Sequence, residues 1–155
     1  MPIFDFRLRP PTGSFLDGAL YGGLVSEMFS SQVEFETASS VKNKSMDLLF
    51  QEMDAAEVKK GLVLGRVSNI YGAIGAEEIA AVVNTNPNRF VGAAALDLVD
   101  WKGAIKVIKK AMKNGLKAVN FEPGFCDLPM YSDDRRLYPI YAYCEEKNIP
   151  VVIMG

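Results

Sequence analysis

The sequence predicts an α/β protein with a parallel sheet, and within that class it favours part of a (βα)8 barrel over a doubly wound open sheet. Apolar runs of strand length alternate with amphipathic helical windows. The later strands start about 30 residues apart, which is the length of a strand–helix–strand unit. Their apolar runs do not alternate with polar residues, as is typical of parallel strands buried on both faces.

The N-terminal part of the chain contains two expected strands and one expected helix. The first strand is Pro2–Phe6, and a segment rich in glycine and serine follows from residue 10 to residue 44. A helix is expected over Met46–Val58, with Ser45 as its N-cap. Four of its apolar residues have the i, i+3, i+4, i+7 spacing of one buried face, namely Met46, Leu49, Phe50 and Met53. A buried strand is expected next, at Gly61–Val67.

The C-terminal part continues this alternation. It contributes a helix from Glu77 to Asn86, a strand at Phe90–Leu96, a helix from Trp101 to Lys113, a strand at Leu116–Phe121, a helix from Leu137 to Asn148 and a strand at Pro150–Met154. Acidic residues at the start of the first helix and lysines at the end of the second suit the helix dipole. Gly115 suits the position after a helix C-terminus, and Pro139 is tolerated in a first helical turn.

The turn after the first strand argues against a dinucleotide-binding open sheet. It reads Arg-Leu-Arg-Pro-Pro and lacks the G-x-G-x-x-G pattern. The predicted total is five strands and four helices, whereas a complete barrel has eight of each. The fifth strand also ends the sequence, so that no helix covers it. We therefore expect residues 1–155 to be the N-terminal portion of a single barrel domain that is cut after strand five.

Composition excludes several classes of protein. With 155 residues, 49% hydrophobic content and a net charge of −2, the chain can bury a core and is not disordered. Two cysteines cannot form a disulfide framework, and the acidic charge balance argues against nucleic-acid binding. The absence of histidine excludes a Ser-His-Asp triad, a Cys-His pair and imidazole metal ligands. No signal peptide and no apolar run of about 18 residues is recognisable, so a cytoplasmic protein is expected.

Parallel α/β folds bind ligands at the carboxyl ends of their strands. At the first strand, Asp5, Arg7 and Arg9 are expected to point to one side because side chains alternate along a strand. Guanidinium groups at a barrel mouth need partners, which either Asp5 and Glu122 or a substrate carboxylate or phosphate would supply. Glu122 is also a candidate general base. The candidate substrate-binding residues at the other strand ends are Arg66, Asn69, Tyr71 and Asn120.

Several stretches resemble the amidohydrolase-2 branch of the amidohydrolase superfamily, which comprises TIM-barrel hydrolases and decarboxylases. Ile3–Arg9 resembles the hydrophobic-Asp-x-His-x-His strand that opens this branch, and Gly115–Phe121 resembles its fourth strand. Leu137–Tyr141 and Ile149–Met154 match its Leu-Tyr-Pro-Ile/Leu-Tyr helix and the following Ile/Leu-Pro-Val-x-Ile-His strand. The resemblance covers nearly the whole chain and is most specific after Gly115.

The resemblance implies a divalent-metal site with histidine ligands on the first and fifth strands. The corresponding positions here are Arg7, Arg9 and Met154. Arginine and methionine are poor ligands for zinc or manganese, and two guanidinium charges repel a cation. We therefore expect no metal and no other cofactor. Some relatives, such as the lactonase acting on a pyrone dicarboxylate, work without metal and hold anionic substrates with arginines.

The resemblance and the substitutions together predict a metal-independent hydrolase acting on a small carboxylated lactone or similar ester. Arg7 and Arg9 would bind the carboxylate or polarise the carbonyl, with Glu122 or a residue from the remainder of the barrel as general base. One alternative is a non-catalytic binding or scaffold protein on a degenerate barrel. Another is a metal-dependent hydrolase or decarboxylase with carboxylate ligands such as Asp5 and Glu122. The expected partner is a small anionic molecule rather than nucleic acid or a membrane, and a homo-oligomer stays open.

Overall fold

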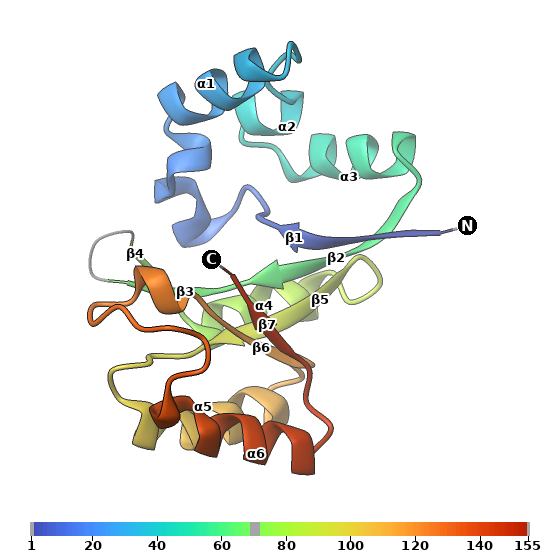
Figure 1. The fold of residues 1–155 in the computed structure, drawn as a ribbon. Helices are drawn as coiled ribbons and strands as arrows, with labels where there is room; N and C mark the ends of the chain where they lie inside the picture. The colour runs from blue at the N-terminus through green and yellow to red at the C-terminus, as the bar shows by residue number, and fades with distance from the viewer. Residues whose placement is uncertain (1, 69–71, 155) are drawn as a thin grey trace.

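The computed structural model describes residues 2–68 and 72–154 of the chain. Its centre is a five-stranded sheet in the order β1-β2-β5-β6-β7, in which every neighbouring pair is parallel. The strands are β1 (Ile3–Leu8), β2 (Val58–Leu64), β5 (Phe90–Ala95), β6 (Ala118–Phe121) and β7 (Val151–Ile153) (Figure 1). They follow one another around the sheet in chain order, as in one half of a (βα)8 barrel. The predicted fold class is thereby confirmed.

Helices cover the outer face of the sheet, and their apolar side chains share the main core with Val63, Ala94 and Val119 of the strands. The covering helices are α4 (Ala76–Thr85), α5 (Trp101–Lys113) and α6 (Tyr138–Glu146). Asp100 caps α5 by accepting a hydrogen bond from the backbone N–H of Gly103. The single tryptophan, Trp101, opens that helix and is half-buried. A smaller apolar cluster of Leu62, Leu64, Ala93 and Ala118 buries side chains of β2, β5 and β6.

The second strand differs from the prediction in its position. It was expected at Gly61–Val67 but runs over Val58–Leu64, because Gly65 interrupts it. Residues Arg66–Ser68 leave the parallel sheet as β3 and pair antiparallel with β4 (Gly72–Ile74). The first strand extends two residues beyond its expected end, to Leu8.

The segment between the first two strands of the sheet contains helices that the sequence did not predict. It forms α1 (Leu24–Gln32), α2 (Ser39–Lys42) and two short 3-10 helices at Gly13–Asp17 and Ala19–Tyr21. The expected helix follows as α3 (Met46–Ala55), capped by the Ser45 hydroxyl. It stops earlier than predicted, before a residue with a φ of 58°, Glu57. The described part of the chain thus contains six α-helices, against the four predicted.

The N-terminal helices stand over one rim of the half-barrel (Figure 1). Two aromatic side chains anchor the segment, since Phe15 and Tyr21 are both buried in the main core. No helix of the described residues is long and apolar enough to cross a bilayer.

Candidate functional site

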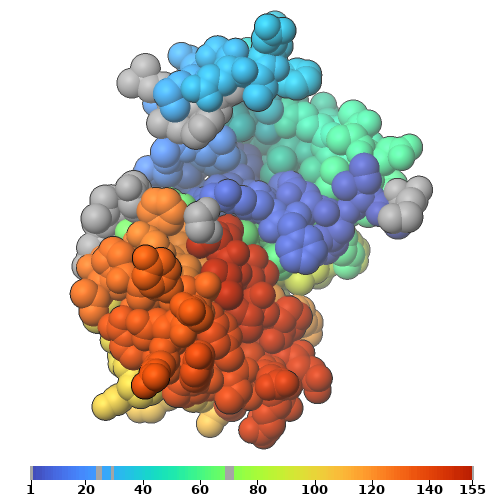
Figure 2. Space-filling view, viewed as in Figure 1, coloured from blue at the N-terminus to red at the C-terminus, as the bar shows by residue number. Residues whose placement is uncertain are grey.

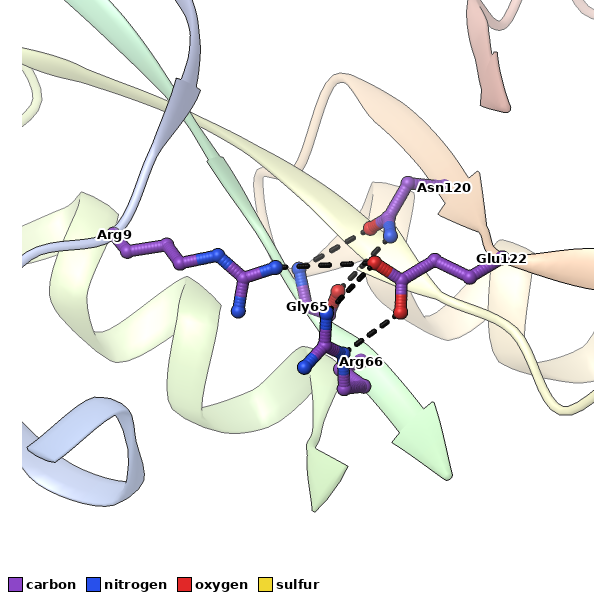
Figure 3. Close-up of polar contacts among 5 residues, drawn as sticks. All are labelled: Arg9, Gly65, Arg66, Asn120 and Glu122. Carbon is purple, nitrogen blue, oxygen red and sulfur yellow. Dashed lines mark hydrogen bonds and ion pairs between the residues drawn. The ribbon is translucent and has the colours of Figure 1, made fainter. Parts of the chain in front are cut away.

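Charged side chains gather where β1, β2 and β6 end at their carboxyl ends. Arg7 lies near the end of β1, Arg9 directly follows it, and Arg66 lies in β3, just after the break that ends β2. We call these three residues the arginine cluster. Glu122 directly follows β6 and faces two members of the cluster, Arg9 and Arg66 (Figure 3). The strand-end positions named from the sequence are therefore brought together in space.

Glu122 forms a two-point ion pair with Arg66. The Arg66 Nε donates to Oε2 of Glu122 over 2.7 Å, and Nη2 donates to Oε1 over 3.0 Å. Glu122 is buried, with 8% of its surface exposed, and most of the Arg66 side chain is also removed from solvent. A bidentate pair of this kind fixes the plane of the guanidinium as well as its distance.

Arg9 is held less completely. Its Nη2 lies 3.8 Å from Oε1 of Glu122, beyond hydrogen-bonding distance. That nitrogen is buried and has no hydrogen-bond partner among the described residues. Burial and the positive charge of Arg66 lower the pKa of Arg9, and Glu122 opposes this shift. Arg9 Nη2 thus forms an ion pair with Glu122 but no hydrogen bond within the described residues.

Asn120 is fully buried and braces the strand break behind the arginine cluster. Its Oδ1 accepts from the Gly65 backbone N–H over 3.2 Å, and its Nδ2 donates to the Gly65 carbonyl over 2.9 Å. The side chain crosses from β6 to β2, which are separated in the sheet by β5. It was predicted to bind substrate, but in the structure both ends of its amide contact Gly65.

A cavity of about 620 Å³ opens beside the arginine cluster. Arg7, Arg9 and Arg66 line it together with Ser14 and Asp17 of the N-terminal segment. We call this space the arginine cavity. Its size is that of a small-molecule site. Glu122 and Asn120 are not among its lining residues.

Asp5 does not pair with the guanidinium of Arg7. The register between β1 and β2 is irregular between Asp5 and Leu8, so side chains do not alternate strictly there. Asp5 instead accepts a hydrogen bond of 2.8 Å from the backbone N–H of Arg7, whose side chain stays exposed. The two other predicted site residues, Asn69 and Tyr71, lie outside the described residues.

Comparison with known proteins identifies the family of this chain. An amidohydrolase family model matches residues 39–155, about three quarters of the chain. The chain belongs to the amidohydrolase family. A search of curated proteins finds no match.

Solved structures agree on the fold of this member of the amidohydrolase family. An uncharacterised TIM-barrel protein from Bordetella bronchiseptica superposes with a TM-score of 0.92 at 39% identity, over 99% of this chain and 55% of that one. A 4-oxalomesaconate hydratase from Rhodopseudomonas palustris gives a TM-score of 0.63 at 21% identity, over 97% of this chain and 51% of that one. For a 2,6-dihydroxybenzoate decarboxylase from Rhizobium the values are 0.60 and 16%, over 95% and 46%. The chain spans about half the length of the structures that it matches.

At the positions that the sequence resemblance aligns with metal ligands, the described residues carry side chains that are poor ligands for a divalent metal. Two of the corresponding positions carry the guanidinium groups of Arg7 and Arg9, which line the arginine cavity. The third, Met154, packs against the apolar cluster of the strands. Within residues 2–68 and 72–154, no group of three His, Cys, Asp or Glu side chains is placed to hold a metal ion. The nearby carboxylate of Glu122 is already bound by Arg66.

Sequence reasoning missed the residues that the N-terminal segment brings to the cavity. Ser14 and Asp17 stand in a stretch that reads as a glycine- and serine-rich excursion, without the periodicity of a helix. The available signal was the pair Phe15-Leu16, an apolar anchor within this polar stretch. Because Phe15 follows the first strand closely in the sequence, its burial would have placed Ser14 and Asp17 near the carboxyl end of that strand.

Proposed function

We propose that this amidohydrolase is a metal-independent hydrolase that acts on a small carboxylated lactone or similar ester, held by the arginine cluster. The observation that carries the proposal is the buried Nη2 of Arg9, which lacks a hydrogen-bond partner among the described residues and belongs to a side chain lining the cavity. A buried donor left unpaired costs about 1–3 kcal/mol. A substrate carboxylate in the cavity would supply the missing acceptor and charge.

The charges of the site support an anionic ligand. Three guanidinium groups line the cavity, and Glu122 compensates only part of their charge. Arginine recognises carboxylates through two parallel hydrogen bonds, which also fix the orientation of the bound group. A guanidinium directed at the scissile carbonyl would stabilise the negative charge that develops on its oxygen.

In the proposed reaction, water attacks the carbonyl carbon and the bond from that carbon to the ring or ester oxygen breaks. The proton lost by the water passes to a base, and the leaving oxygen takes up a proton to give a hydroxyl. We propose that Glu122 is a positioning residue in this reaction rather than the base. Its two oxygens already accept hydrogen bonds from Arg66, and it does not line the cavity.

The test measures turnover of a panel of carboxylated lactones and aryl esters by the intact protein. Turnover is compared after treatment with a chelator and after addition of Mn²⁺ or Zn²⁺. We expect turnover that survives the chelator and falls about 100-fold in Arg9→Ala, the loss typical of removing one oxyanion donor. Arg135→Ala removes an exposed arginine that does not line the cavity, so it is the matched control.

Two results would contradict the proposal. Turnover that requires an added metal ion would favour a metal-dependent hydrolase or decarboxylase. Carboxylate binding without turnover across the panel would favour a binding protein on this fold.

A further inference from the structure

Asp17 brings a carboxylate to the cavity that the arginine cluster lines. It ends the 3-10 helix Gly13–Asp17, whereas the arginines come from β1, from the residue after it and from β3. The cavity therefore has a cationic lining from the sheet and an acidic side chain from the N-terminal segment.

The segment that carries Asp17 is fixed at both ends. At one end, the backbone N–H of Ser14 donates to Oε1 of Glu78 in α4 over 2.6 Å. Gly13 has a φ of 50° and lies so close to this carboxylate that a side chain would collide with it. At the other end, the hydroxyl of Tyr21 donates to the Arg9 carbonyl over 2.6 Å. Asp17 is thus held at a defined place relative to the arginines.

Asp17 does not neutralise the arginine cluster. No ion pair or hydrogen bond joins its side chain to another residue of the described part of the chain. Asp17 and the three arginines line one cavity from different elements, and no ion pair joins them within the described residues, so the lining carries both signs of charge. Because a single charge of either sign would match only part of this lining, the arrangement suits a ligand with different groups at its two ends.

We propose that Asp17 selects substrates that carry a hydrogen-bond donor, a hydroxyl or an ammonium group, at the end opposite the carboxylate. The carboxylate end of this inference rests on the proposed function, whereas the donor end rests on Asp17 alone. A hydroxyl would donate a hydrogen bond to the Asp17 carboxylate, and an ammonium group would add an ion pair to it.

The test is isothermal titration of the intact protein with straight-chain carboxylates of four to six carbons. Each chain length is used plain, with a terminal hydroxyl and with a terminal ammonium group. We expect a donor to raise affinity at least fivefold at one chain length. Asp17→Ala removes this gain, and plain carboxylates bind it at least as tightly as they bind the wild type, because a negative charge has left the cavity lining. Asp17→Asn separates the two donors, because its amide oxygen still accepts from a hydroxyl but no longer attracts an ammonium charge.

Two controls keep the outcomes distinct. Asp47→Asn removes an exposed acidic residue of α3 outside the cavity lining and is expected to leave all affinities unchanged. Arg9→Ala is expected to lower the affinity for every carboxylate. Equal affinity for plain and donor-bearing carboxylates, or a gain that survives Asp17→Ala, overturns the inference about Asp17 and leaves the proposed function standing. Binding that is insensitive to Arg9→Ala overturns the proposed function instead.

Discussion

Glu122 contacts two of the three arginines of the cluster and is more deeply buried than either. Its removal would leave two guanidinium groups without the carboxylate that balances them. Breaking a buried pair by removing one partner costs more than the pair itself contributes, because the remaining charge stays desolvated. The role of this residue can therefore be read from stability as well as from activity.

We predict that Glu122→Gln lowers the free energy of unfolding by about 3 kcal/mol, the lower part of the range for a broken buried pair. The neutral amide keeps the size of the side chain but loses its charge. The measurement is urea denaturation followed by circular dichroism. Glu146→Gln is the control, since Glu146 forms an ion pair with Lys147 at the surface, and its stability should equal that of the wild type. A stability of Glu122→Gln equal to that of the control would mean that Glu122 does not balance the arginines.

At the scale of the elements, Gly65 determines where β2 ends, because it lies between the last residue of β2 and the first residue of β3. A Cβ atom at this position would lie 2.6 Å from the Ile74 carbonyl oxygen and 2.9 Å from the Cβ of Ala95. The first contact is with backbone, which cannot move aside as a flexible side chain does. The break that presents Arg66 to the cavity therefore needs glycine.

We predict that Gly65→Ala lowers the free energy of unfolding by more than about 2 kcal/mol, as overpacking does at tightly filled sites. Gly124→Ala is the matched control, since a Cβ there would meet no atom within 4 Å. Both variants are compared by thermal and urea denaturation. If the two are equally stable, then the backbone around Gly65 relaxes and the strand break does not depend on glycine.

Tyr21 links the N-terminal segment to β1, and its ionisation gives this link a pH dependence. Burial and the negative charge of Glu52 raise the pKa of Tyr21 to about 12, and Arg9 opposes the shift. The unfolded chain releases this proton near pH 10. The contribution of the group is therefore complete below about pH 10 and is lost as pH rises through about 12.

We predict that wild-type stability falls between pH 10 and 12 by up to about 2 kcal/mol more than that of Tyr21→Phe, which has no phenol to ionise. Below pH 9, Tyr21→Phe should be less stable by about 1 kcal/mol, because it lacks the hydrogen bond to the Arg9 carbonyl. Tyr131→Phe, at an 85% exposed site, should show neither effect. Parallel pH profiles for the wild type and Tyr21→Phe would contradict this account.

The order of the parallel strands could be predicted because each buried strand is a continuous apolar run. Phe90–Leu96 and Leu116–Phe121 were placed within one or two residues of β5 and β6 for this reason. The segment from residue 10 to residue 44 could not be predicted, because its helices are short and depend on anchors such as Phe15. The predicted end of β2 was wrong because Val67 was included as part of the apolar run, whereas the strand ends just before Gly65, where Ile74 and Ala95 leave no room for a Cβ atom.

At the scale of the whole molecule, the sheet has two open edges, β1 and β7. Phe4, Phe6 and Ile153 on these edges are 42%, 64% and 44% exposed, and the two phenylalanine rings pack together with their centroids 5.3 Å apart. Figure 2 shows the N-terminal strand and the C-terminal end of the chain on the same visible face. Exposed apolar side chains on one face of a molecule attract other apolar molecules.

We predict that the 155-residue chain binds the dye ANS and that Phe6→Ser reduces this binding by half or more. The serine breaks the aromatic pair without disturbing a buried side chain. Leu128→Ser, at a 52% exposed loop position, is the control and should leave dye binding unchanged. Equal dye binding by both variants and the wild type would place the apolar surface elsewhere.

The members of the candidate site could be named from the sequence only in part. Arg7, Arg9, Arg66 and Glu122 were found because they follow strands, and the ends of parallel strands converge. Their pairing was not predictable, because it depends on how far each side chain reaches across the sheet. Asp17 was missed, since it comes from the one segment whose path the apolar pattern does not determine.

Trp101 has an optical consequence for work on this protein. It is the only indole in the chain, it opens α5, and it does not line the arginine cavity. Its fluorescence will change when α5 unfolds and is sensitive to the ammonium group of Lys102, which lies 5.5 Å from the ring centroid. It will not respond to a ligand bound among the arginines. A fluorescent probe of ligand binding has to be introduced into the cavity. Leu20→Trp in a Trp101→Phe background would place a single tryptophan in the cavity wall.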